Sequence, residues 1–183
     1  MYFLITCAGS KQKPIMYSPS CLEKLSFNDE LVDIRREIIK MTGVNLNWDY
    51  TMPAWQLYSG NRSQLYSKIE ISNWHKPCLK IKILSALFGW IDYNDFIPIY
   101  DLKMTDKVLY SNKTISIWHY WKVKKILHKF INPEKDIDLL SGNYRKAITG
   151  KTTPIAITPS INFNDYGAKK GKWLNYQLKT LNC

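Results

Sequence analysis

The chain has no long hydrophobic run, and it holds few of the residues that build metal or disulfide sites. No stretch of its 183 residues approaches the ~18 apolar residues of a membrane span. Its first residues lack the basic leader of a secretory signal, so we expect a cytoplasmic protein without a membrane partner. Three histidines and four scattered cysteines, with no C-x-x-C pair, argue against a metal site and against structural disulfides. We therefore expect no metal and no cofactor.

Acidic residues are scarce, because 15 Asp and Glu stand against 26 Lys and Arg for a net charge of +11. The excess is uneven. Residues 1–100 hold 11 basic and 9 acidic side chains (net +2), whereas residues 101–183 hold 15 and 6 (net +9). Aromatic residues make up 14% of the chain, and positive charge with stacking side chains suits a nucleic acid, DNA first of all. An acidic protein would be attracted by the same charge.

Two lysine clusters in the basic half are candidates for contacting backbone phosphates. Both clusters are also compatible with ordinary solvated helix faces, and Trp121 and Trp173 within them are equally compatible with the core. The candidate lysines are Lys122, Lys124, Lys125, Lys129, Lys169, Lys170 and Lys172.

Short apolar segments alternate with amphipathic ones along the chain. This alternation predicts a single α/β domain over residues 1–183, with a mixed β-sheet flanked by helices. The expected strands cover residues 2–7, 79–86, 136–141 and 154–158. The expected helices cover residues 28–43, 59–71, 114–130, 143–148 and 170–181. The connecting residues 45–58 and 88–104 are expected to be non-repetitive.

No common catalytic signature is present, such as G-x-x-x-x-G-K-[ST], G-x-G-x-x-G, G-x-S-x-G or H-E-x-x-H. Five other segments are unusual, namely Thr6–Lys11, Pro53–Gly60, Leu84–Ile91, Ile97–Met104 and Leu139–Tyr144. In this order they resemble the YaaA family of peroxide-stress proteins and a set of shorter relatives. The most specific part runs from Leu84 to Met104, where Phe88 stands for the usual aromatic residue and Ile99 separates Pro98 from Tyr100. Asp101 replaces the arginine of the longer relatives.

The resemblance implies a mixed α/β, YaaA-like fold and DNA binding. The fold of the family has been compared with base-processing enzymes, so base removal is a hypothesis by analogy alone. An N-glycosylase must extrude the nucleotide and stabilise the positive charge that develops on the sugar. Asp101 is our first candidate for the stabilising carboxylate, and the alternative is a turn residue. Asp92 and Asp95 are the other carboxylates considered.

A base pocket would be walled by aromatic side chains, since stacking contributes ~1–3 kcal/mol per base. The candidate walls, which would otherwise be core residues, are Tyr58, Phe88 and Tyr100. Asn143 either reads a base edge or caps a helix. Ser10 and Lys11 follow the first strand, where α/β proteins commonly place a site. Lys11 is assigned to a phosphate, with an amine nucleophile as the alternative.

Three functions remain open at this stage. The first is a DNA-acting N-glycosylase that excises a modified base, in repair or in defence against foreign DNA. The second is a DNA-binding stress-response protein of the YaaA type without turnover. The third is a basic module that binds RNA or an acidic protein.

Overall fold

The computed structural model describes residues 1–160 and 167–181 of the chain. In these residues short strands alternate with helices. The strands are β1 (Phe3–Thr6), β2 (Thr51–Pro53), β3 (Ile81–Ser85), β4 (Gly89–Asp92), β5 (Phe96–Pro98), β6 (Lys107–Tyr110), β7 (Lys113–Ser116) and β8 (Ile137–Asp138). The α-helices are α1 (Asn28–Thr42), α2 (Ala54–Leu57), α3 (Ile71–Trp74), α4 (Ile117–Lys124), α5 (Gly142–Thr149) and α6 (Ala168–Thr180). The 3-10 helices are η1 (Leu22–Lys24), η2 (Tyr66–Lys68) and η3 (Leu127–Phe130).

The central sheet has four strands in the order β4-β3-β1-β8. β1 runs parallel to β3 and β8, whereas β4 is antiparallel to β3. The apolar strands β1 and β3 are almost entirely buried, as expected for strands covered on both faces. Thr6 lies opposite Leu84, so both strands end at the same edge of the sheet. The prediction of a mixed α/β fold is confirmed.

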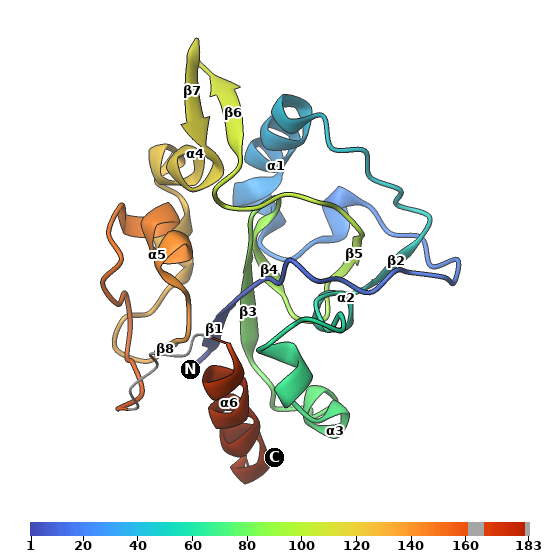
Figure 1. Ribbon diagram of the computed structural model, residues 1–183, viewed down its shortest axis with the longest axis vertical. Coiled ribbons are helices and arrows are strands. Elements are labelled where there is room, and N and C mark those ends of the chain that lie inside the picture. The colour runs from blue at the N-terminus through green and yellow to red at the C-terminus, as the bar shows by residue number, and fades with distance from the viewer. Residues whose placement is uncertain (161–166, 182–183) are drawn as a thin grey trace.

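Helices cover the sheet from both sides. α4 and α5 pack against each other on one side, and α2 and α3 lie on the other (Figure 1). Trp121 of α4 is fully buried, and its Nε1 donates to the carbonyl oxygen of Ala86 at 2.8 Å. Gly89 (φ +66°) permits this packing, because a Cβ there would lie 2.9 Å from the Trp121 ring. Trp121 is therefore a core residue, and Trp173 packs edge-on against Phe3.

The helix predicted over residues 114–130 is wrong in its first and last parts. Its first residues belong to β7, which pairs with β6 in a hairpin that projects from the body (Figure 1). Ser111 and Asn112 have φ values of 48° and 61°, as a tight two-residue hairpin turn requires. α4 then ends where Lys125 takes a left-handed conformation, and η3 follows separately. Cross-strand pairing thus overrides the helical pattern at the start of this segment.

Several other predicted elements are shorter than expected. Residues 59–71 hold only η2 and the first residue of α3, because the chain there turns to pack against α6. Of the last two predicted strands, only Ile137–Asp138 forms a ladder, and Ile157 adds a single bridge to Ile137. The connections at 45–58 and 88–104 also contain short strands, β2 in the first and β4 and β5 in the second.

One expectation about the cysteines is wrong. Cys78 is disulfide-bonded, whereas Cys7 and Cys21 are free thiols. Spacing along the chain does not show which cysteines approach one another in space, and this explains the error. Within residues 1–160 and 167–181, no helix is long and apolar enough to cross a membrane.

Candidate functional site

A pocket of about 190 Å³ opens where β1 ends, and we call it the β1-end pocket. It lies at the carboxyl edge of parallel strands, where α/β folds commonly bind ligands. Among the described residues that line it there is no carboxylate, whereas Arg62 contributes a guanidinium group. The lining residues are Thr6, Cys7, Ala8, Gly9, Ser10, Arg62, Ser63, Gln64, Leu65, Tyr66 and Gly167.

The pocket presents hydrogen-bond donors that other described residues do not use. The backbone N–H groups of residues 8–11 donate to no other residue in the described part of the chain. Ser63 is 4% exposed, and its Oγ has no hydrogen-bond partner among the described residues. A buried hydroxyl without a partner costs about 1–3 kcal/mol, so a ligand that came within hydrogen-bond distance of this atom would recover that cost. Successive free N–H groups form the kind of concavity that binds anions.

The N-terminus of α6 lies at the same pocket. Gly167, the residue before the helix, lines the pocket, and the first turn of α6 holds no acidic residue. Its N-cap residue, Gly167, has no side chain to cap the helix, and the positive end of the helix dipole lies at the pocket. Gly171 fixes this position, since a Cβ on it would lie 2.3 Å from the carbonyl oxygen of Leu65. Arg62 and the N-terminal end of α6 therefore both bring positive charge to the pocket.

Lys11 lies beside the pocket over two tyrosine rings. Its Nζ is 4.5 Å from the ring centroid of Tyr100 and 5.9 Å from that of Tyr58. Burial lowers the pKa of Lys11 below its usual value, whereas Cys7 and Asp101 act in the opposite direction. Asp101 itself is exposed. The structure thus brings Lys11 and Asp101 near each other and places Ser10 in the pocket wall.

The aromatic residues proposed as base-pocket walls lie in the core. Tyr58 and Phe88 are fully buried and Tyr100 is 5% exposed, and none of them lines the β1-end pocket. The Tyr100 hydroxyl is hydrogen-bonded to the Tyr58 hydroxyl at 2.7 Å and to the Ser85 hydroxyl at 2.8 Å. Burial raises the pKa of Tyr58 and Tyr100 well above the usual value. The rings of Tyr58 and Tyr100 pack under the Lys11 side chain and do not face solvent.

Asn143 is exposed on the first turn of α5 and does not line the β1-end pocket. The helix begins after Ser141, so Asn143 is not its N-cap either. The neighbouring Tyr144 does reach the site, because its hydroxyl lies 3.0 Å from the Cys7 sulfur. Arg62 and Ser63 were not predicted as site residues. The sequence offered one indication of them, namely a basic residue two positions after Gly60.

The lysines of the first cluster differ in their surroundings. Lys122 and Lys125 are exposed. Lys124 forms an ion pair with Glu37 of α1, and the Lys129 Nζ lies 3.5 Å from a carboxylate oxygen of Glu30. Acidic residues of α1 therefore neutralise part of this cluster. In the second cluster Lys169 and Lys172 are exposed.

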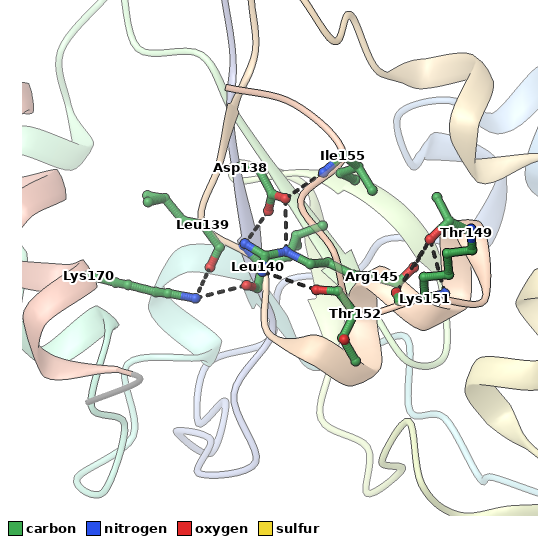
Figure 2. A network of polar contacts seen from close by, with 9 residues as sticks. All are labelled: Asp138, Leu139, Leu140, Arg145, Thr149, Lys151, Thr152, Ile155 and Lys170. Atoms are coloured by element: carbon green, nitrogen blue, oxygen red, sulfur yellow. Dashed lines mark hydrogen bonds and ion pairs between the residues drawn. The ribbon is translucent and has the colours of Figure 1, made fainter. Parts of the chain in front are cut away.

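Lys170 is buried, so it does not lie at the surface where a phosphate contact was predicted. Figure 2 shows its Nζ donating to the carbonyl oxygens of Leu139 and Leu140, at 3.0 and 2.8 Å. Burial and the nearby Arg145 lower the pKa of Lys170 to about 8, and Asp138 opposes this shift. Lys170 thereby ties α6 to the residues that follow β8.

Asp138 organises the adjacent turn (Figure 2). Its carboxylate accepts from the backbone N–H groups of Leu140 and Ile155 at 2.8 and 3.0 Å, and from Nε of Arg145 at 2.9 Å. These contacts satisfy a fully buried charge, so Asp138 is structural. Elsewhere in the described residues, no group of three or more His, Cys, Asp or Glu could hold a metal ion.

A family model for the peroxide stress protein YaaA matches residues 16–180 of the chain. The chain belongs to this family. A comparison with curated proteins gives no match. The predicted resemblance is confirmed, and the matched range begins after β1 and most of the loop that lines the β1-end pocket.

The geometry explains the most specific YaaA-like segment of the chain. The Ser85 hydroxyl accepts from the backbone N–H groups of Leu87 and Phe88, at 3.2 and 3.0 Å, and closes the turn between β3 and β4. The same hydroxyl bonds to Tyr100 from the following crossing. This YaaA-like motif therefore fixes the position of the Tyr100 ring over which Lys11 lies.

Proposed function

We propose that this YaaA-family chain binds DNA, with a backbone phosphate in the β1-end pocket. The observation that carries the proposal is the unpartnered Ser63 hydroxyl in a pocket whose described lining residues include no carboxylate. A phosphate oxygen would accept from this hydroxyl, from the free N–H groups of residues 8–11 and from Arg62. The net charge of +11 would draw a polyanion to the site.

The exposed lysines extend the proposed contact surface beyond the pocket. Lys11 lies next to it, and Lys169 and Lys172 are carried by the helix whose N-terminus it contains. Each phosphate that the protein neutralises releases counterions, so affinity would fall steeply with salt. The proposal needs no catalytic turnover, and it agrees with a role in the stress response that gives the family its name.

The proposal is tested by Ser63→Ala, measured by fluorescence anisotropy with a labelled oligonucleotide and by chemical denaturation. We expect affinity to fall about 5- to 10-fold, because one phosphate partner is lost. We expect the free energy of unfolding to stay the same or to rise by about 1 kcal/mol, because a buried unpaired hydroxyl is removed. The matched control is Ser59→Ala. The Ser59 hydroxyl already donates to the Trp55 carbonyl at 2.7 Å, so stability should fall and affinity should not.

If Ser63→Ala leaves the affinity for DNA unchanged, the phosphate does not bind in the β1-end pocket. Absence of DNA binding in the wild type would remove the proposal itself, and binding of RNA or an acidic protein alone would favour the basic interaction module.

We propose N-glycosylase activity as a second candidate function, on the position of Asp101. This exposed carboxylate is close enough to Lys11 for its charge to act on that side chain, beside the β1-end pocket. A carboxylate there would stabilise the cationic sugar of an extruded nucleotide. Mass spectrometry of DNA carrying modified bases should detect free base, and Asp101→Asn should abolish its release while DNA binding persists. If no base is released from any modified substrate, the second candidate is excluded and the binding proposal stands.

A further inference from the structure

A second pocket, of about 410 Å³, lies on the same loop as the β1-end pocket, and its lining is mainly apolar. We call it the apolar pocket. Its volume falls within the range of small-molecule sites. The lining residues are Lys13, Pro14, Ile15, Asn47, Tyr50 and Ile99.

The two pockets are close neighbours along the chain. Ser10 lines the first and Lys13 lines the second, and three Cα–Cα steps of 3.8 Å separate them by at most ~11 Å. The loop between them is anchored, because the Gln12 N–H donates to the Leu57 carbonyl at 2.7 Å. Lys11 lies between the two pockets over Tyr100, the residue after Ile99. A single extended ligand can therefore contact both pockets.

The apolar pocket exposes aromatic and aliphatic surface that a soluble protein normally covers. Ile15 is 83% exposed, and Tyr50 and Ile99 are about two-fifths exposed. Tyr17 is 70% exposed, and its ring packs edge-on against Tyr50 at 6.2 Å. Lys13 is the charged residue in the lining, and Asn47 offers an amide with both donors and an acceptor.

We infer that the apolar pocket binds one unstacked base of single-stranded DNA whose phosphate lies in the β1-end pocket. This inference rests on the proposed function and names its substrate as a single strand. Aromatic side chains beside a cationic track are how proteins hold single strands without reading their sequence. In duplex DNA the bases are stacked and paired, so this pocket could not reach a base face without extruding it.

The net charge of the chain favours a nucleic-acid occupant over another copy of the chain. Two copies, each with a net charge of +11, would repel each other, and Lys13 would lie in their interface. A single strand brings both the apolar base and the anionic phosphate that the two pockets match.

The experiment compares oligothymidylate with an abasic oligonucleotide of the same length, by fluorescence anisotropy at one salt concentration. The wild type should bind oligothymidylate about 5- to 100-fold more tightly than the abasic strand. Tyr50→Ala and the uncharged substitution Ile99→Ser should each remove most of this preference and leave affinity for the abasic strand unchanged. Tyr176→Ala is the matched control, because Tyr176 is 64% exposed on α6 and lines neither pocket.

The outcomes distinguish failure of base binding in the apolar pocket from failure of the proposed DNA binding. Equal affinity of the wild type for both strands overturns base binding and leaves phosphate binding intact. A preference that survives in both pocket variants also overturns it. If neither strand binds but duplex DNA does, the inference is wrong and the proposed function stands, and if no DNA binds, the proposed function fails as well. If sedimentation shows wild-type dimers that Tyr50→Ala dissolves, while the strand preference is unaffected, the occupant is a second copy and the inference is wrong.

Discussion

The cations of α4 and η3 and those around the loop after β1 have very different surroundings. Lys124 at the end of α4 and Lys129 in η3 are paired with carboxylates of α1. Lys13 on the loop and Arg62, which follows α2, line pockets whose described lining residues include no carboxylate. The charge count along the sequence predicts that the basic C-terminal half contacts DNA. In the folded chain, however, carboxylates of α1 neutralise part of that charge. The local field at a site therefore depends on which elements meet, and net charge along the sequence does not give it.

The largest effect is expected when the loop itself is displaced. Gly60→Ala would place a Cβ 2.7 Å from the Lys11 backbone nitrogen and 2.6 Å from the Ser10 Oγ. Because backbone atoms must move, we expect the free energy of unfolding to fall by about 1–3 kcal/mol and DNA affinity to fall more than ~10-fold. Denaturation and anisotropy measure the two effects. Gly9→Ala controls for stability, since its Cβ would meet nothing within 4 Å.

A smaller loss is expected when the loop cations are neutralised without moving the backbone. The double substitution Lys11→Met and Arg62→Met removes two charges beside the β1-end pocket. We expect affinity for single-stranded DNA to fall about 10-fold at moderate salt, because charge-assisted contacts to phosphate are lost. Circular dichroism should show an unchanged fold. Wild-type affinity in this variant would contradict the account of the loop.

Lys170 sharpens the comparison as a lysine of the basic half that has a structural role. Its pKa is about 8 in the folded chain against 10.5 for a free lysine. Between these values the unfolded chain holds more protons, so this group makes stability rise with pH from 8 to 10.5. Lys170→Met should remove a rise on the order of 1–3 kcal/mol between pH 8 and 10, measured by chemical denaturation. An identical pH profile in the wild type and the variant would disprove this.

The smallest effect is expected for the paired lysines of α4 and η3. Lys124→Met with Lys129→Met removes two charges that Glu37 and Glu30 already neutralise. DNA affinity should change less than ~3-fold, and stability should fall by less than about 1 kcal/mol because both pairs are partly exposed. Fluorescence anisotropy measures the DNA affinity of this variant and of the variant with Lys11→Met and Arg62→Met under the same conditions. An equal loss of affinity in both variants would contradict the difference between the two regions.

The sequence predicted the elements whose burial pattern is strong. β1 is a nearly continuous apolar run, and β3 lies in a segment that begins with alternating residues and ends apolar. α1 shows a clear apolar stripe that ends at Gly43 with φ +62°. The hairpin β6–β7 was missed because its residues carry a pattern that suits a helix equally well. Pairing with β6 and the left-handed turn at Ser111 and Asn112 determine that these residues form a strand and not a helix.

The candidate site was predicted in part. Ser10 and Lys11 follow a buried strand, and this topology alone places them at the edge of the sheet. Tyr58 and Phe88 carry the same chemistry as pocket walls, yet they are fully buried, and residue type does not distinguish the two roles. The Ser63 hydroxyl could not be found from sequence, since its missing partner is a property of the packed structure.

The most direct test of the central claim is the salt dependence of single-stranded DNA binding in two double variants. In the variant with Lys11→Met and Arg62→Met, the slope of log affinity against log salt should become shallower by about 1.4, or ~0.7 for each lost phosphate contact. The slope of the variant with Lys124→Met and Lys129→Met should match the wild type. If the variant of Lys124 and Lys129 loses the slope and the variant of Lys11 and Arg62 keeps it, DNA lies on α4 and η3, and the β1-end pocket is not the phosphate site.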